Sequence, residues 1–325
     1  MNCSGLCDYP PGKHPFLFFV PTNNIMNILR KLFNEYRLHN ARKLFRQKWA
    51  VGIYEGGSIE DLRPSSRVTN PVLTAADVTD VTAELIADPF VLKHGEKWYM
   101  FFEVLNVKEL KGQIGLATSG DGYSWTYEKI VLREPFHLSY PFVFKYKNEI
   151  YMIPETGETK TIRLYKADNF PFEWTLTHTL LTGKKFKDTT LFRHQNVWWM
   201  QTDTSENARH DQLRLYYAEE LTGPWTEHPV SPLVDGDPLK ARPAGRVVAH
   251  DNKLIRFTQE CYPDYGLGVS AYHITNLTKT DYAEIRISDS TIIHGSGNGW
   301  NRSGMHHIDA IQTDNGGIIA YTDGW

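Results

Sequence analysis

Residues 87–103 read ADPFVLKHGEKWYMFFE, and the same pattern returns twice at the same length. The second copy, residues 139–155, reads SYPFVFKYKNEIYMIPE, and the third, residues 187–203, reads KDTTLFRHQNVWWMQTD. In each copy two runs rich in β-branched and aromatic residues flank a polar turn, which predicts a β-hairpin. A third run follows every hairpin, and a Trp-Thr pair then begins a fourth, at 125–126, 174–175 and 225–226. Four strands in a repeat of roughly 50 residues are the content of one propeller blade.

The repeats continue to the end of the chain. A fourth, more divergent copy begins at Arg242, turns at 250–252 and runs to Glu260, with a third strand at 268–274. A fifth copy, 306–323, contains a hairpin only, and residues 50–55 (AVGIYE) resemble the third strands of the other copies. We therefore expect the N-terminal strands to complete the last blade and close the ring, which removes exposed sheet edges. The sequence predicts an all-β fold, a five-bladed β-propeller over residues 48–325.

Residues 1–47 are predicted to form an N-terminal extension with a basic amphipathic helix at 23–46, where apolar residues recur at helical spacing. Two interpretations stay open: the helix packs on the main domain, or it lies on an anionic membrane surface. No run approaches the ~20 apolar residues of a transmembrane helix, and the start of the chain lacks the features of a signal peptide. Together with only three cysteines, too few for a disulfide framework, these features favour a cytoplasmic protein.

Composition narrows the classes of partner. The net charge of −3 gives no cationic excess for a phosphate backbone, which argues against a nucleic-acid partner. Aromatic residues make up 13 % of the chain, which suits both β-strands and surfaces that stack on sugar rings, so we expect a carbohydrate ligand. We expect no cofactor, because the sequence has no Gly-rich phosphate loop, no Cys-x-x-Cys pair and no nucleophile elbow.

The position of the candidate site follows from hairpin geometry. The start of a blade's first strand and the end of its second strand meet at the same face of the ring, because the two strands are antiparallel. In blades one to three these places hold Asp88 and Glu103, Tyr140 and Glu155, and Asp188 and Asp203. In blade four they lie near Ala244 and near Gln259 and Glu260, and in blade five near His307 and Asp309 and near Asp323. Buried carboxylates are costly unless they are hydrated, paired or used. Two interpretations stay open: each acid caps a turn or pairs with an arginine, or the acids together act on a ligand.

Two sets of residues carry a resemblance to known families. The ADPF start at 87–90 followed by WYM at 98–100 resembles the first blade of five-bladed glycoside hydrolases of family 43 and their relatives. The stretches RPAGR at 242–246 and IRFTQEC at 255–261, followed by Tyr265-Gly266, resemble the N-terminal propeller domain of glucosamine inositolphosphorylceramide transferases and its bacterial relatives. In the family 43 pattern, first-strand acids of three blades serve as general base, pKa-modulating Asp and general acid. The resemblance implies Asp88 as base and puts Tyr140 in the modulating place and Asp188 in the acid's place.

We predict a glycosidase-like site whose catalytic candidates are Asp88, Asp188, Glu155 and Glu260. Glycoside hydrolysis needs one acid to protonate the leaving oxygen and one carboxylate to activate water or attack, and Glu155 or Glu260 supplies the longer arm that Asp188 lacks. The predicted ligand contacts are Glu103, Tyr140, Asp203, Arg242, Arg246, Gln259, Tyr265, His307 and Asp309. The alternative function is a non-catalytic sugar-binding or accessory propeller in glycan or glycolipid assembly.

The two arginines, one tyrosine and two neighbouring histidines have further candidate roles. Arg242 and Arg246 either bind an acidic group of a sugar or bridge neighbouring acids. Tyr265 is a candidate for ring stacking. We expect no metal site at His306 and His307, because alternation along a strand sends the two side chains to opposite faces.

Overall fold

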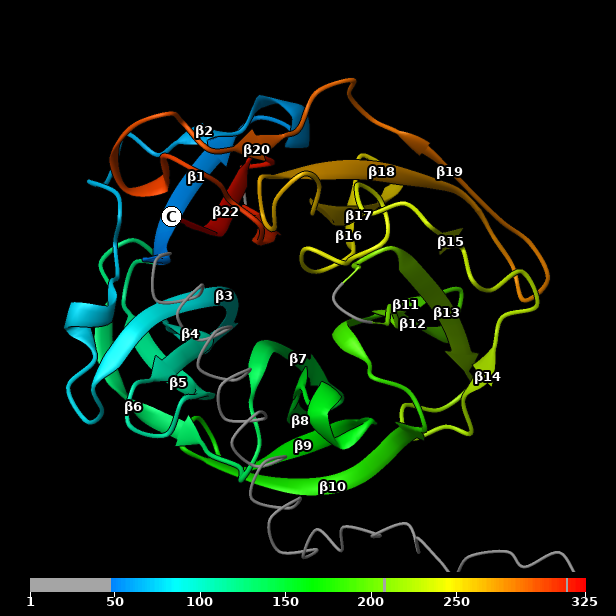
Figure 1. Ribbon diagram of the computed structural model, residues 1–325, viewed down its shortest axis with the longest axis horizontal. Coiled ribbons are helices and arrows are strands. Elements are labelled where there is room, and N and C mark those ends of the chain that lie inside the picture. Colours follow the sequence, from blue (N-terminus) through cyan, green and yellow to red (C-terminus); the bar gives the residue numbers. More distant parts are fainter. Residues whose placement is uncertain (1–47, 207–208, 314) are drawn as a thin grey trace, which may run out of the picture. The chain divides into compact units, whose positions relative to one another are not determined.

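The structure, a computed structural model, describes residues 48–206, 209–313 and 315–325. Its strands form five sheets that surround a central axis (Figure 1), so the predicted five-bladed β-propeller is confirmed. The chain divides into the units Met1–Leu44 and Phe45–Trp325. The predicted helix at 23–46 lies outside the described residues. Within the described ranges, no helix has both the length and the apolar character needed to cross a membrane.

Each blade is an antiparallel sheet that meanders outward from the axis. Blade one contains β3 (Ala83–His94), β4 (Lys97–Asn106), β5 (Lys111–Ser119) and β6 (Thr126–Leu132). Blade two contains β7 (Ser139–Tyr146), β8 (Glu149–Glu155), β9 (Thr161–Asn169) and β10 (Glu173–Thr182). Blade three contains β11 (Lys187–His194), β12 (Val197–Asp203), β13 (Gln212–Ala218), β14 (Thr226–Glu227) and β15 (Val234–Asp235). Blade four contains β16 (Val248–His250), β17 (Lys253–Glu260), β18 (Gly268–Leu277), β19 (Tyr282–Arg286) and β20 (Ile293–His294). Short 3₁₀ turns η1 (Ile59–Asp61), η2 (Ala75–Asp77), η3 (Gly157–Thr159) and η4 (Gly299–Asn301) lie in the connections.

Blade five combines the two ends of the propeller sequence. Its sheet order is β2 (Arg63–Pro64), β1 (Ala50–Gly56), β22 (Ile318–Gly324) and β21 (Ile308–Gln312). Strand β1 pairs with β22 along its whole length, from Ala50 opposite Gly324 to Gly56 opposite Ile318. The predicted closure of the ring by N-terminal strands is confirmed, and Figure 1 shows blue β1 beside red β22.

The first strand of blade four is shorter than the repeat predicted. Residues 242–247 form only isolated bridges, one between Pro243 and Thr258 and one between Gly245 and Ile308. Pro243 has no N–H to donate to a ladder. Gly245 has φ of 151°, and a Cβ there would lie 1.8 Å from the carbonyl oxygen of Ile308. This segment therefore passes too close to blade five to pair regularly, and regular pairing begins at Val248.

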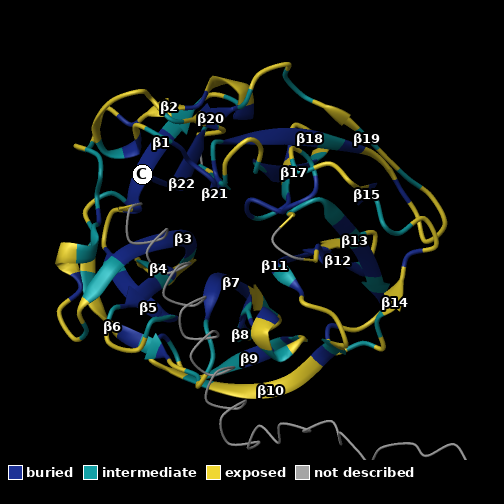
Figure 2. Cartoon of the chain, in the orientation of Figure 1, coloured by how far each residue is buried: buried dark blue, intermediate teal, exposed yellow. Residues whose placement is uncertain are grey.

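The core lies between neighbouring blades. The largest apolar cluster joins Phe101 of β4, Phe142 of β7 and Met200 of β12, all buried, and so connects blades one to three. Figure 2 shows the inner strands largely buried, whereas the outer strand β10 is mostly exposed. Because the packing fixes the inner strands, residues at their starts are held in place at one end of the ring.

Candidate functional site

In blades one to three, one residue of the first strand has a left-handed backbone. It is the second residue of β7 and of β11, as the repeat predicted, but the sixth residue of β3, because β3 begins earlier, at Ala83. Asp88, Tyr140 and Asp188 have φ of 54°, 45° and 47°, and next to each of them the pairing with the second strand shifts register. A bulge re-aims a side chain, and a left-handed non-glycine residue costs about 1–3 kcal/mol. Because such strain clusters at functional sites, we take this end of the ring as the candidate site.

Asp88 connects β3 to blades two and five. Its N–H donates to Oδ2 of Asp323 (3.0 Å), and its Oδ2 accepts from the N–H of Tyr140 (3.2 Å). Its Oδ1 is buried and has no hydrogen-bond partner among the described residues. The nearest ring nitrogens are Nε2 of His306 at 3.6 Å and Nδ1 of His307 at 3.7 Å. Burial raises the pKa of Asp88 well above its ordinary value, against the opposing effect of His306.

His306 and His307 reach the same carboxylate oxygen, so the prediction that they point to opposite faces is wrong. Both residues precede β21, and both backbone N–H groups donate to Oδ1 of Asp323, at 3.1 and 3.0 Å. Because His306 and His307 lie before β21 and both bind the carboxylate of Asp323, their side chains do not alternate as they would within a strand. Burial disfavours a charged His306, but Asp323, 2.8 Å from its Nδ1, raises the pKa of His306 overall. Burial lowers the pKa of His307 to about 4.

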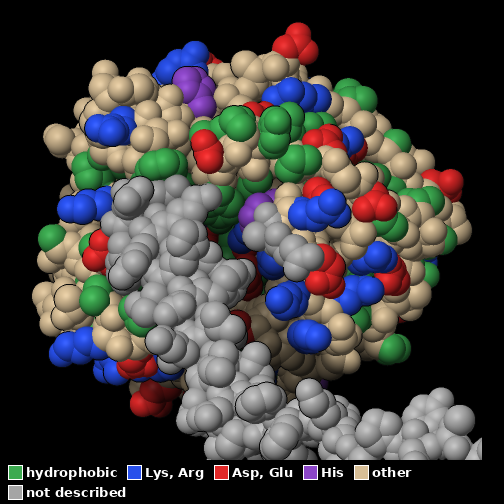
Figure 3. Space-filling view, in the orientation of Figure 1, with side chains coloured by type: hydrophobic (Ala, Val, Ile, Leu, Met, Phe, Trp, Pro, Cys, Tyr) green, Lys and Arg blue, Asp and Glu red, His purple; other side chains and the backbone are tan. Residues whose placement is uncertain are grey.

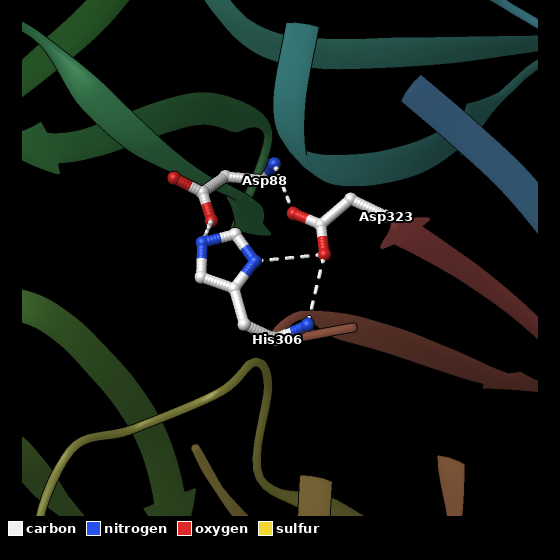
Figure 4. A group of neighbouring side chains, drawn as sticks. All are labelled: Asp88, His306 and Asp323. Atoms are coloured by element: carbon white, nitrogen blue, oxygen red, sulfur yellow. Dashed lines mark hydrogen bonds and ion pairs between the residues drawn. The ribbon is translucent and has the colours of Figure 1, made fainter. Parts of the chain in front are cut away.

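The group of Asp88, His306 and Asp323 is compact enough to hold a metal ion. One potential ligand atom from each lies within 4.8 Å of the others (Figure 4). However, Oδ2 of Asp323 accepts from the Asp88 N–H, and its Oδ1 accepts from the N–H groups of His306 and His307. An ion would compete with these donors, so the hydrogen bonds themselves account for the arrangement. The cluster joins blade one to blade five.

Asp188 on β11 is neutralised by an arginine from blade four. Nε of Arg242 lies 2.5 Å from its Oδ2 and Nη2 lies 3.2 Å from its Oδ1. Gln259 Nε2 donates to the same Oδ2 at 2.6 Å. Burial alone would raise the pKa of Asp188, but the guanidinium lowers it below its ordinary value. Arg242 also donates from Nη1 to Nδ1 of His210 (2.8 Å), and burial beside this cation lowers the pKa of His210 to about 3.

Glu155, at the end of β8, differs from its acidic neighbours. Its Oε2 is buried without a hydrogen-bond partner among the described residues, and Nη2 of Arg242 stays 3.6 Å away. Burial and the negative charge of Asp188 raise the pKa of Glu155 to about 8, although Arg242 opposes the shift. At neutral pH Glu155 therefore keeps its proton, while neighbouring Asp188 is ionised.

Glu103, at the end of the second strand of blade one, is paired by a histidine that sequence reasoning missed. Nε2 of His137 lies 3.3 Å from Oε1 of Glu103, and Nδ1 of His137 accepts from the N–H of Gly112 (2.9 Å). Because Nδ1 accepts this hydrogen bond, the ring proton lies on Nε2, which faces Glu103. His137 lies in the connection between blades one and two, where no periodic pattern marks it.

Arg246 and Asp309 form a second ion pair further along the first strands. Nε of Arg246 lies 2.8 Å from Oδ1 of Asp309, and Asp309 Oδ2 accepts from the N–H of Val91 (2.7 Å). The guanidinium carbon lies 4.9 Å from the ring centroid of Phe142. Of the two roles foreseen for Arg246, bridging a neighbouring acid is the one observed.

The structure does not bring Glu260 to this cluster. Glu260 accepts from Ser270 (2.7 Å) and Arg286 (2.9 Å) on the outer strands of its own blade, while the adjacent Gln259 reaches Asp188. Side chains alternate along β17, so only one of the two neighbours faces the axis. Glu260 is therefore in the wrong place for the catalytic role predicted for it.

Asp203 and Tyr265 both lie beside His210 at the rim of the cluster. Oδ2 of Asp203 is 4.0 Å from Nδ1 of His210 and has no hydrogen-bond partner among the described residues. The Tyr265 ring lies 5.3 Å from His210 and 5.1 Å from His306, centroid to centroid, and 5.2 Å from the guanidinium carbon of Arg242. In Figure 3 the centre of this face is hollowed, and acidic, basic and histidine side chains surround the hollow.

Comparison with known families matches almost the whole propeller. A family model described as glucosamine inositolphosphorylceramide transferase 1, N-terminal, matches residues 45–325. The chain belongs to this family. A glucosamine inositolphosphorylceramide transferase 1 from Oryza sativa subsp. japonica is 40 % identical over 298 residues, 85 % of this chain and 40 % of the relative. The Arabidopsis thaliana protein of the same name is 34 % identical over 296 residues, 85 % of this chain and 39 % of the relative. The chain thus spans about two fifths of the length of the transferases it matches.

Solved structures with a similar fold include glycoside hydrolases. The catalytic domain of a GH62 α-L-arabinofuranosidase from Coprinopsis cinerea has a TM-score of 0.58 and 13 % identity, covering 85 % of this chain and 97 % of that one. A family 117 glycoside hydrolase from Zobellia galactanivorans has a TM-score of 0.51 and 14 % identity, covering 74 % and 85 %. At such identities the likeness shows the fold alone. The resemblance to the N-terminal propeller of glucosamine inositolphosphorylceramide transferases is confirmed.

Within this family member, the carboxyl groups of the cluster differ in how closely a basic side chain holds them. Asp188 is held by Arg242, Asp309 by Arg246 and Glu103 by His137. Asp88, Glu155 and Asp203 instead each keep one buried oxygen without a hydrogen-bond partner among the described residues. The nearest nitrogens of His306, Arg242 and His210 lie 3.6, 3.6 and 4.0 Å from these oxygens. Asp88 of blade one and Glu155 of blade two can therefore supply a proton acceptor and a proton donor at the same end of the ring.

Proposed function

We propose that the family propeller is a carbohydrate-active domain that cleaves a glycosidic bond at the Asp88 end of its axis. Glu155 serves as the general acid and Asp88 as the general base or nucleophile. The observation that carries the proposal is the buried Oε2 of Glu155, which has no hydrogen-bond partner among the described residues and lies 3.6 Å from Arg242. Burial and the neighbouring charge of Asp188 raise the pKa of this carboxyl group to about 8. A carboxyl group that keeps its proton at neutral pH can protonate the leaving oxygen of a glycoside.

Asp88 is suited to the complementary role. Its raised pKa makes it a stronger base than an ordinary aspartate once it is ionised. His306, whose pKa is itself raised by Asp323, lies 3.6 Å from the free Oδ1 and stabilises the ionised form. The hydrogen bonds of Asp88 to blades two and five fix the carboxyl group in position.

The remaining residues hold this pair of carboxyl groups. Asp188, fixed by Arg242 and Gln259, keeps a negative charge beside Glu155 and so keeps the proton on that residue. Tyr265 presents an aromatic ring at the rim, against which a sugar ring can stack.

Activity measurements on a panel of polysaccharides and aryl glycosides test the proposal. Asp88→Asn and Glu155→Gln should each lower kcat by roughly 10²–10⁴-fold, the usual cost of losing a general acid or base. Melting temperatures close to that of the wild type would show that the fold is intact. The matched control is Glu260→Gln, which removes a carboxylate outside the cluster and should leave kcat unchanged. Full activity in Asp88→Asn would remove Asp88 from the mechanism.

A second candidate function is supported by the ion pairs. Arg242 and Arg246 neutralise Asp188 and Asp309, an arrangement that suits binding as well as catalysis. The curated relatives are named as transferases, and this chain covers 40 % of the japonica rice protein. A propeller that binds a glycan beside a separate transferase activity fits these facts. Glycan binding without turnover, unaffected by Asp88→Asn, would favour this second candidate.

A further inference from the structure

A pocket lies at the junction of blades five and one, next to the carboxyl cluster. It has a volume of about 710 Å³ and is bounded by the start of β1, the connection before η2, the start of β3, η4 and the last residue of the chain. The starts of β1 and β3 and the end of β22 lie at the Asp88 end of the ring, because Ala50 pairs with Gly324 and Ile86 donates to Trp49 O at 3.3 Å. The pocket therefore belongs to the same face as the candidate site.

Three tryptophans form part of the pocket wall: Trp49, Trp300 and Trp325. Trp49 and Trp325 pack together with ring centroids 5.9 Å apart. Trp300 is half-buried and occupies space that only a glycine at position 52 leaves free, since a Cβ there would lie 2.4 Å from its ring. Indole rings that line a pocket are surfaces on which the apolar faces of sugar rings stack.

The pocket lies close to Asp88, and Trp49 and His306 stand between the two. The Trp49 ring lies 4.1 Å, centroid to centroid, from the ring of His306, and His306 in turn lies 3.6 Å from Asp88. Trp49 is itself only 3 % exposed, so its ring forms the wall between the pocket and His306.

The charge of the pocket differs from that of the cluster. Lys48 and Arg302 line it, and both are exposed. Neither forms an ion pair with any residue that the structure describes. Glu84 is the single acid in the lining, which leaves a positive excess. The carboxyl cluster would repel an anionic group, whereas the excess of cationic side chains in the pocket lining favours one.

We propose that this pocket binds a sugar unit that bears an anionic group, a phosphate or a carboxylate. The sugar ring stacks on Trp300 and Trp325, because Trp49 is buried behind them, and the anion pairs with Lys48 and Arg302. Binding in the pocket needs no turnover, so this proposal does not depend on the proposed function.

Calorimetric titration of the full chain with glucose 6-phosphate, glucuronate and glucose tests the proposal, with tryptophan fluorescence as a second readout. Glucose 6-phosphate, glucuronate or both should bind more tightly than glucose and change the fluorescence, and the two charged probes distinguish a phosphate from a carboxylate. Lys48→Gln combined with Arg302→Gln should weaken this binding at least about tenfold, since charge-assisted hydrogen bonds are lost.

The matched control replaces two exposed lysines elsewhere, Lys129→Gln with Lys145→Gln, and should leave the affinity unchanged. Glu155→Gln should also bind normally, which separates this pocket from the catalytic proposal. Three results would overturn the pocket assignment: no binding of either charged sugar, equal binding of glucose, or an unchanged affinity in the Lys48 and Arg302 variant.

Discussion

At the scale of single residues, the main feature is a pair of carboxyl groups with opposite pKa shifts. Arg242 lowers the pKa of Asp188, and burial together with Asp188 raises that of Glu155 to about 8. Because the two pKa values are shifted in opposite directions, Asp188 carries the negative charge at neutral pH and Glu155 carries the proton. Neither residue behaves in this way alone, because each shift depends on its neighbour.

The first prediction concerns the pH dependence of activity. If Glu155 is the general acid, kcat/KM should fall as pH rises through about 8, because its proton is then lost. Asp188→Asn removes the negative charge that helps to keep this proton, so the falling limb should move to lower pH. A pH–rate profile of both proteins measures the effect. An unchanged falling limb in Asp188→Asn would exclude Glu155 as its origin.

The second prediction concerns stability. The folded pKa of Glu155 lies near 8 and its ordinary value is 4.5, so the folded state keeps a proton that the unfolded state loses. Stability from this group is present below 4.5 and is lost as pH rises towards 8. Glu155→Gln should therefore be more stable than the wild type at pH about 9, by roughly 1–3 kcal/mol. At pH about 4 the two should be alike, and urea unfolding at both pH values provides the comparison.

Sequence reasoning located part of this cluster. The repeat placed Asp88, Glu155 and Asp188 at the same end of the ring because hairpin register alone determines that. The repeat could not show which of Gln259 and Glu260 faces the axis, because that depends on the exact register of β17. Both residues were therefore named as candidates. His137 and His210 were missed, because they lie in connections that carry no periodicity.

At the scale of elements, the hairpin turns between the first and second strands share a left-handed residue. Gly95 has φ of 60° in blade one, and Lys147 has φ of 55° in blade two. Glycine takes this conformation without steric cost, whereas a residue with a side chain does not. The turns of blades one and two therefore share one left-handed position, whereas blades three and four have two in a row, at Gln195 and Asn196 and at Asp251 and Asn252.

The third prediction exchanges these turn residues. Lys147→Gly should raise the free energy of unfolding by about 0.5–1 kcal/mol, and Gly95→Lys should lower it by a similar amount. Lys145→Gly, in the extended part of β7, is the control and should destabilise the protein, because glycine weakens a strand. Urea unfolding measures all three, and a destabilised Lys147→Gly would show that the lysine side chain outweighs its backbone strain.

The repeat predicted the elements of blades one to three better than those of blade four. Residues 242–247 aligned with the other first strands, but the structure has only isolated bridges there. The alignment reports sequence similarity, whereas pairing also depends on how closely a segment approaches the next blade. That approach at Gly245 is a tertiary property that no local pattern reveals.

At the scale of the whole molecule, closure of the ring depends on one pair of strands. Strand β1 supplies the third strand of blade five and pairs with β22 over its full length. The half-length fifth repeat was enough to predict this closure. Sequence alone did not reveal that His306, Trp49 and Trp325 pack together where the two ends meet.

The fourth prediction removes the closing strand. Deletion of residues 1–60 should prevent soluble folding, because blade five loses β1 and β22 gains an exposed edge. Deletion of residues 1–44, which keeps every described strand, is the control and should give a soluble protein. Solubility, size-exclusion chromatography and thermal melting compare the two. A soluble, monomeric 61–325 fragment with an unchanged melting temperature would contradict the closure scheme.

The pairing of β1 with β22 also sets the order of events during biosynthesis. Strand β1 is made among the first of the propeller, yet its partner Ile318–Gly324 is made after all four complete blades. Throughout translation the emerging chain therefore carries an unpaired strand, which is a template for association with other chains. Contacts between such distant residues also form slowly. We expect the nascent propeller to depend on chaperones until Ile318–Gly324 emerges and pairs with β1.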